Sequence, residues 1–176
     1  GAWVTDWPSG GRRHTRGRAD VPRPRKVMVI GVADFAVDTA GTVDGVPVQS
    51  WVYPEDRGPG LKDLGQGPPI LRFFEENLGP YPYAKLANVQ STTRYGGMEN
   101  AAAIFYSETA VADGEDDTSL LAHEIAHQWY GNTVTEADWP HLWLSEGFAT
   151  YLTGLYLEHA RGAAALRQYM TAARRQ

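Results

Sequence analysis

Two histidines and two glutamates in the second half of the chain have the types and spacing of a zinc hydrolase site. His123, Glu124 and His127 form an H-E-x-x-H motif, and Glu146 follows on what the pattern predicts to be the next helix. Residues four apart lie on one helical face, so both imidazoles can reach one ion. Zinc with three protein ligands lowers the pKa of a bound water to ~7, and Glu124 is placed to take its proton. These residues indicate metal-assisted hydrolysis.

The residues around the motif predict the helix that this chemistry needs. Asp117 or Thr118 is a capping candidate, and Gly131-Asn132 offers a stop. For an isolated motif, histidines that merely bond to backbone or solvent would be an equal alternative. Apolar residues at helical spacing favour the helix, and they are Leu120, Leu121, Ile125 and Trp129.

A second helix is predicted from Asp138 to Gly162, because Pro140 suits a first helical turn. Glu146 lies near its start, where an acidic residue could simply complement the helix dipole. However, apolar residues flank Glu146, and an unpaired carboxylate among them would be costly. A metal ion would compensate that charge, so Glu146 is a candidate third ligand. The apolar face would comprise Leu144, Phe148, Tyr151, Leu152, Leu155 and Tyr156.

The remaining pattern predicts an α+β fold, with strands first, a mixed sheet next and helices last. Residues 54–69 are rich in Gly, Pro and charge, and they are expected to form a linker or boundary loop. The other predicted elements are strands over 26–37, 46–53, 86–92 and 101–106, and helices over 70–78 and 163–175.

Three motifs, in this order along the chain, resemble the M1 family of zinc aminopeptidases. The zinc motif reads HEIAHQWYGN over 123–132, and the third-ligand motif reads WLSEGFA over 143–149. Eighteen residues separate His127 from Glu146, which is the family spacing. Upstream, GGMEN over 96–100 resembles the family's exopeptidase motif.

The resemblance implies a role for each of these residues. His123, His127 and Glu146 would bind one zinc ion per chain, and Glu124 would be the general base. The substrates would be peptides with a free N-terminus, whose α-amino group Glu99 would bind. The substrate-binding segment would comprise Gly96, Gly97, Met98, Glu99 and Asn100.

The resemblance also implies a domain organisation. In the family, an N-terminal β domain precedes a thermolysin-like catalytic domain. Residues 1–53 would be the end of the first domain, and residues 54–176 would be the upper part of the second. Missing parts of the parent chain are expected to pack on the apolar surface left exposed.

One family residue has no counterpart here. The family uses a tyrosine well downstream of the third ligand to stabilise the tetrahedral oxyanion, but 30 residues follow Glu146 in this sequence. Tyr151, Tyr156 and Tyr169 lie too close in sequence, and the first two are interpreted as packing residues. Removing one oxyanion donor typically costs ~10²–10³ in rate, so the activity of the isolated chain is in question.

Composition and charge limit the classes of partner that the chain is expected to bind. The net charge of -5 argues against a nucleic-acid partner, although residues 1–26 carry seven Arg or Lys and are expected to be a solvated loop. No run of 18 apolar residues predicts a membrane segment, and no signal peptide is visible. The absence of cysteine excludes disulfides and thiolate ligands but leaves the compartment undetermined.

Two alternatives to an aminopeptidase remain at this stage. A zinc endopeptidase would share the histidine and glutamate ligands, but it has no terminal amine for the GGMEN segment to recognise. A non-catalytic binding module is the second alternative. The intact zinc motif argues against it, and the missing tyrosine argues for it.

Overall fold

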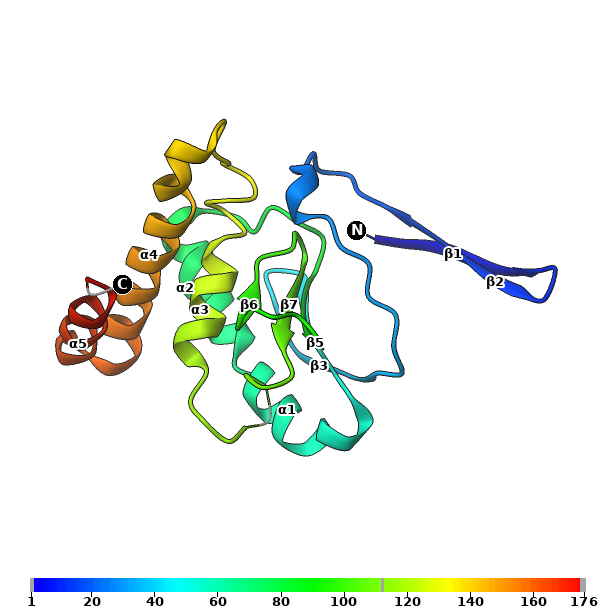
Figure 1. Cartoon of the computed structure of the whole chain (residues 1–176), viewed down its shortest axis with the longest axis horizontal. Coiled ribbons are helices and arrows are strands. Elements are labelled where there is room, and N and C mark those ends of the chain that lie inside the picture. The colour runs from blue at the N-terminus through cyan, green and yellow to red at the C-terminus, as the bar shows by residue number, and fades with distance from the viewer. Residues whose placement is uncertain (1, 112, 175–176) are drawn as a thin grey trace.

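The computed structural model describes residues 2–111 and 113–174, which form a mixed sheet, two layers of helices and a projecting hairpin (Figure 1). This confirms the α+β prediction. The strands are β1 Ala2–Ser9, β2 Arg12–Arg18, β3 Ala36–Val43, β4 Val46–Val52, β5 Leu86–Ser91, β6 Gly97–Met98 and β7 Ala103–Ser107. The α-helices are α1 Arg57–Leu64, α2 Gly67–Leu78, α3 Thr118–Ala126, α4 Glu146–Arg161 and α5 Ala163–Ala173. Short 3-10 helices cover Arg25–Val27, Pro54–Asp56 and Trp139–Leu144.

The sheet places the GGMEN segment over 96–100 at one of its edges. Among the described residues it has five strands in the order β3-β4-β5-β7-β6. The pairs β4-β5 and β5-β7 are parallel, whereas β3-β4 and β6-β7 are antiparallel. Asp44 and Gly45 both have positive φ at the turn between β3 and β4, as a tight hairpin turn requires. Edge strand β6 lies next to α3 (Figure 1).

The hydrophobic core fills the space between the sheet and the helices α1, α2 and α3. Side chains alternate along β4, so that Val48, Ser50 and Val52 are buried towards these helices. Helix α2 contributes Ile70, Leu71 and Phe74, all fully buried, and α3 contributes Leu121 and Ile125. A further layer forms where α4 contacts α3 and α5 contacts α4. The helix that carries the zinc motif is therefore packed on both sides.

Two predicted segments around the sheet differ from the structure. The strand expected over 26–37 is a 3-10 turn followed by a chain outside the sheet, and sheet pairing begins at Ala36. An apolar run alone does not decide strand formation, and Ile30 and Val32 are both about nine-tenths exposed. The loop expected over 54–69 is largely helical, because the packing of Gly60 and Leu64 against the sheet overrides weak helix propensity.

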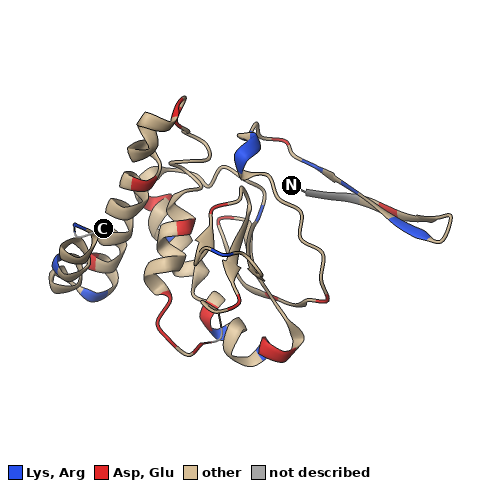
Figure 2. Ribbon diagram, in the orientation of Figure 1, with Lys and Arg blue, Asp and Glu red and all other residues tan. Residues whose placement is uncertain are grey.

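The basic N-terminal segment is a β-hairpin and not the expected loop. Strands β1 and β2 pair antiparallel, and the hairpin extends away from the sheet (Figure 1). Figure 2 shows Lys and Arg gathered along β2, whose residues are all exposed. The side chain of Arg13 pairs with Asp6, and Trp7 stacks on His14.

The division at residue 53 stays a prediction. Strands β3 and β4 precede it and β5 follows it, and all three belong to one sheet. No helix in the described part of the chain is long and apolar enough to cross a membrane.

Candidate metal centre

Helix α3 carries the zinc motif, and the local sequence explains where the helix begins. The Asp117 side chain makes no capping bond, although Asp117 occupies the cap position. Instead the Asp116 carboxylate accepts a hydrogen bond from the Thr118 amide at 3.2 Å. The same carboxylate pairs with Arg161 near the end of α4, so this contact also ties α4 to the start of α3. The α-helix ends at Ala126, and His127 keeps a helical conformation.

The Asp117 side chain gives a testable pH dependence of stability. Burial, and then the negative charges of Asp113, Asp63, Asp116 and Glu115, raise its pKa to about 6. The folded state therefore favours the protonated form. Protonated Asp117 therefore contributes to the free energy of unfolding. The contribution is complete below the pKa of ~3.9 that Asp117 has in the unfolded chain, and it is lost as the pH rises through about 6. One carboxylate oxygen is buried without a hydrogen-bond partner among the described residues.

We therefore expect Asp117→Asn to be more stabilising, relative to wild type, at pH 7.5 than at pH 4. The two-unit shift would correspond to ~2.7 kcal/mol, and solvent screening of this partly exposed group reduces it to ~1 kcal/mol. Urea unfolding of both proteins at the two pH values measures this difference. Asp38→Asn, on the exposed face of β3, is the control. An equal effect of Asp117→Asn at both pH values would contradict the prediction.

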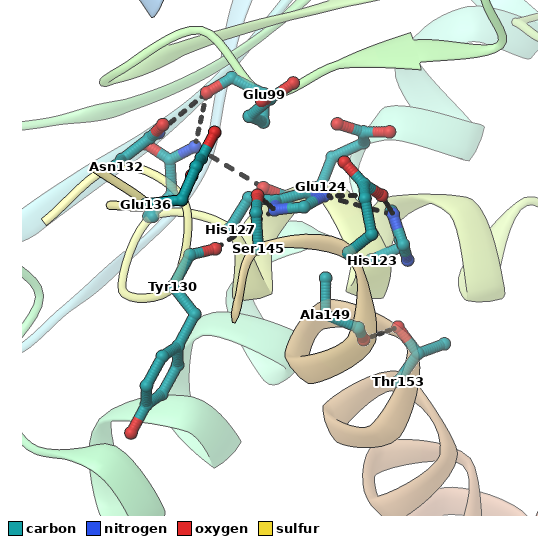
Figure 3. A network of polar contacts seen from close by, with 12 residues as sticks. Glu99, His123, Glu124, His127, Tyr130, Asn132, Glu136, Ser145, Ala149 and Thr153 are labelled. Atoms are coloured by element: carbon teal, nitrogen blue, oxygen red, sulfur yellow. Dashed lines mark hydrogen bonds and ion pairs between the residues drawn. The ribbon is translucent and has the colours of Figure 1, made fainter. Parts of the chain in front are cut away.

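The structure brings the three predicted ligands together. Nε2 of His123 lies 3.1 Å from Nε2 of His127, and Glu146 Oε2 lies 3.2 Å and 3.6 Å from these two nitrogens. The three donor atoms all lie within 4.8 Å of one another. Figure 3 shows the contact between the rings of His123 and His127. Tetrahedral zinc with bonds of about 2.0–2.2 Å needs donor atoms about 3.3 Å apart, so this triangle fits zinc.

The outer nitrogen of His127 has partners that fix its ring. Nδ1 lies 3.0 Å from the Tyr130 carbonyl oxygen and 3.2 Å from Ser145 Oγ. A carbonyl oxygen only accepts hydrogen bonds, so Nδ1 of His127 carries the proton. The lone pair on Nε2 is then free to bind a metal and faces His123 Nε2 and Glu146 Oε2. Gly131 has φ 117, and a Cβ there would lie 2.9 Å from His127 Nδ1 and 2.5 Å from Ser145 Oγ. Glycine is therefore required behind the His127 ring.

Glu146 reaches the site from the first turn of α4. The predicted continuous helix from Asp138 is wrong, because a 3-10 helix ends at Leu144 and α4 begins at Glu146. This break places Ser145 behind His127 and the Glu146 carboxylate in front of it. Contact with His123, and then with His127, lowers the Glu146 pKa well below its usual value. Burial lowers the His127 pKa, but Glu146 and other nearby carboxylates outweigh burial and raise it.

We call His123, His127 and Glu146 together the donor group. Glu124 lies beside the donor group and is not one of its members. Its carboxylate rests against Gly97 of β6, in the space that a side chain at Gly97 would need. Burial raises the Glu124 pKa to about 8, His127 opposes this, and the charges of Glu99 and Glu146 reinforce it. A bound cation would favour the ionised carboxylate by Coulomb attraction. A carboxyl group in such surroundings can exchange a proton near neutral pH.

The GGMEN segment over 96–100 lies beside Glu124. Gly96 packs loosely against Leu120 of α3, and Gly97 contacts Glu124. Glu99 is half-buried, and its main-chain carbonyl accepts hydrogen bonds from Gln128 and Asn132. Met98 and Asn100 also line a cavity of about 570 Å³ with residues of the 29–35 segment, including Phe35. The substrate-binding roles of these residues stay predictions.

A second cavity of about 560 Å³ opens at the donor group, between α4 and α5. Its walls include His123, Glu146, Tyr151 and Tyr169. The interpretation of Tyr151 as a packing residue is wrong, because its side chain is 51% exposed and lines this cavity. Tyr156 is buried against Phe73, as expected of a packing residue. This cavity offers room for a ligand at the donor group.

The quoted motifs contain Gln128, Asn132 and Ser145, but the sequence predicted no supporting role for them. Gln128 follows Glu124 by four residues, so it lies on the same helical face. Asn132 was interpreted as part of a helix stop and as the last residue of the zinc motif, and its contact with Glu99 spans 33 positions. Helical periodicity could have indicated the first of these residues. The long-range contact of Asn132 carries no local signal.

Comparisons with known proteins agree with this geometry. The model of the peptidase family M1 domain matches residues 63–176. The chain is 35% identical to aminopeptidase M1 of Arabidopsis thaliana over 139 residues, which cover 73% of this chain and 16% of that protein. It is 33% identical to aminopeptidase N of Mus musculus over 152 residues, which cover 79% of this chain and 16% of the relative.

Solved structures give the same result. A mutant M1 zinc metallopeptidase from Deinococcus radiodurans, bound to a Tyr-Ser-Ala substrate, superposes with a TM-score of 0.78 and 26% identity. The match covers 92% of this chain and 37% of that one. The chain thus spans only part of the length of the proteins it matches. Its sequence, its donor group and its fold agree, and the chain belongs to peptidase family M1.

Proposed function

We propose that the chain carries the active site of a zinc aminopeptidase, which removes N-terminal residues from peptides. The observation that carries the proposal is that one helix, α3, contacts both halves of such a site. His123 and His127 of this helical segment face Glu146, and Glu124 faces Gly97 of the exopeptidase segment. An aminopeptidase needs a hydrolytic centre and an amine anchor at a fixed separation.

Each residue of the donor group has a defined part in the proposal. His123, His127 and Glu146 would hold one zinc ion per chain. Such an ion supplies Lewis-acid polarisation of the scissile carbonyl and activation of water. The Glu124 carboxylate accepts a proton from the attacking water and delivers it to the leaving amine. Its position against Gly97 keeps it beside the donor group without making it a ligand.

Glu99 supplies the specificity for a free N-terminus. An ammonium group needs an acceptor, and a half-buried carboxylate forms a stronger charge-assisted hydrogen bond than a solvated one. Gly97 leaves room for the Glu124 carboxylate, and β6 is the edge strand of the sheet, so an extended peptide could approach its main chain from the open side. The substrate would then lie along the sheet edge, with its first peptide bond at the donor group.

The full-length protein would complete this site. Trp139 and Trp143 are 74% and 61% exposed on the 3-10 segment before Glu146, and Tyr151 is exposed on α4. We propose that further parts of the protein cover this apolar surface and supply the oxyanion donor. By resemblance to the family's domain organisation, residues 1–53 would belong to an N-terminal β domain and 54–176 to the catalytic domain.

Glu99→Ala is expected to shrink the preference for a free amine. Loss of a charged hydrogen bond costs about 1.5–3 kcal/mol, which corresponds to a roughly 10- to 150-fold loss in kcat/KM for a peptide with a free N-terminus. The N-acetylated peptide lacks the ammonium and should be little affected. The measurement compares kcat/KM for both peptides in the full-length protein, wild type and variant, together with zinc content. Glu108→Ala, just after β7, is the control.

Two results would overturn the proposal. If wild type cleaves the free and the acetylated peptide equally well, Glu99 is no amine anchor and an endopeptidase is favoured. If the full-length protein binds zinc but hydrolyses neither peptide, the site belongs to a binding module.

A further inference from the structure

Two buried side-chain amides converge on the main-chain carbonyl of Glu99. Asn132 Nδ2 donates a hydrogen bond to this oxygen at 2.7 Å, and Gln128 Nε2 donates one at 3.2 Å. Figure 3 shows the side chain of Asn132 directed at Glu99. Both amides are almost inaccessible to solvent, with exposures of 1% for Asn132 and 0% for Gln128. The anchor predicted for the substrate amine is thus held by the segment that follows α3.

Gln128 also holds the turn after Glu99. Its Oε1 accepts a hydrogen bond from the Ala102 amide at 3.0 Å and one from the Tyr81 hydroxyl at 3.5 Å. Ala102 has φ 67, a left-handed conformation that costs roughly 1–2 kcal/mol for a residue with a Cβ. The second Nε2 hydrogen faces the Glu124 carbonyl at 3.4 Å. One amide therefore fixes both ends of the turn from Glu99 to Ala102 and connects it to α3.

Asn132 links the same carbonyl to a metal-binding candidate. Its backbone amide donates a hydrogen bond to the His127 carbonyl at 3.1 Å, while its side chain reaches Glu99. The Glu99 oxygen can only accept, so the nitrogen of the Asn132 amide must face it. Its Oδ1 is buried without a partner in the described part of the chain, which costs stability. Asn132 therefore donates its hydrogen bond to the Glu99 carbonyl even though this orientation leaves its own Oδ1 without a partner among the described residues.

We propose that Gln128 and Asn132 are positioning residues for amino-terminal specificity, because they set the separation between Glu99 and the donor group. The inference rests on the proposed function. An aminopeptidase must hold the substrate amine one residue from the bond it cleaves. A displacement of about 1 Å can cost on the order of 10² in rate, so the anchor needs rigid support. Neither amide would touch the substrate, and both would act through Glu99.

The test measures the ratio of kcat/KM for a peptide with a free amine to that for its N-acetylated form, in the full-length protein. We expect Asn132→Ala to keep zinc and to lower this ratio about tenfold, through displacement of the anchor. Gln128→Met, which removes the donor at similar volume, should act in the same direction. Thr133→Val is the control, because it removes a hydrogen bond to the Gln128 carbonyl in the same turn and leaves in place both amides that contact Glu99.

A double mutant separates positioning from general support of the fold. If Asn132 acts through Glu99, adding Asn132→Ala to Glu99→Ala should change the ratio no further, whereas independent effects would add. The proposal is overturned if Asn132→Ala and Gln128→Met slow both peptides equally and leave the ratio unchanged. Loss of zinc from both variants would overturn it as well, since it would assign them to the metal site. A wild-type ratio of one would instead show that the proposed amine recognition itself fails.

Discussion

Glutamine in place of Glu124 is expected to lower kcat for peptide hydrolysis by ~10²–10⁴-fold while zinc stays bound, because general acid–base catalysis is worth that much. The amide has the shape of the carboxyl group but cannot take up a proton from water. Glu124 lies outside the donor triangle, so its replacement removes no ligand. Its side chain is buried against Gly97, and a neutral group of the same size should be accommodated there.

Steady-state kinetics and elemental analysis of the full-length variant check this expectation together. Glu76→Gln, on the exposed side of α2, makes the same chemical change away from the site and should have normal activity. Near-normal turnover of the Glu124 variant would exclude it as the base. Loss of zinc together with activity would instead make Glu124 a ligand.

Alanine in place of His127 is expected to abolish stoichiometric zinc binding, and hydrolysis with it. Removal of a group that merely supports a ligand typically lowers metal affinity by about 10–100-fold, so loss of a ligand should exceed this range. The two remaining donors, His123 and Glu146, are partly exposed and would have to recruit water in place of a buried imidazole. Zinc titration against a competing chelator measures the affinity.

The control for this experiment is His141→Ala. His141 is exposed on the 3-10 segment before Glu146 and lies outside the donor group. Circular dichroism shows whether the His127 variant remains folded, because the cavity left beside Ser145 could also disturb α4. Full zinc occupancy in a folded His127 variant would rule out the assignment of this residue as a ligand.

The donor group could be predicted from the sequence because most of it is local geometry. Helical periodicity brings His123 and His127 together without help from the rest of the fold. Glu146 required more information, namely its apolar neighbours and the family spacing. The strand at β4, the helix at α2 and the helix at α5 were also predictable, since periodicity and flanking Pro or Gly mark them.

The features that could not be predicted depend on contacts between distant segments. The apolar run 28–32 has the composition of a strand, but no neighbouring strand pairs with it. Helix α1 contains two glycines and a proline, and its packing against β4 decides its conformation. The role of the Gln128 and Asn132 amides depends on their contacts with the turn from Glu99 to Ala102, which is distant in sequence. Local patterns do not encode such pairings.

The donor group comes from two helical segments, with the histidines on α3 and the residue after it and Glu146 on α4. The affinity for a metal ion therefore depends on how firmly α4 packs against α3. The two histidines stay together in any state in which α3 is intact, whereas Glu146 joins them only when α4 rests on α3. By thermodynamic reciprocity, a metal ion strengthens that docking by the same factor by which docking strengthens metal binding. Substitutions far from the donors, such as at the Arg161–Asp116 ion pair, can therefore be read out as changes in zinc affinity.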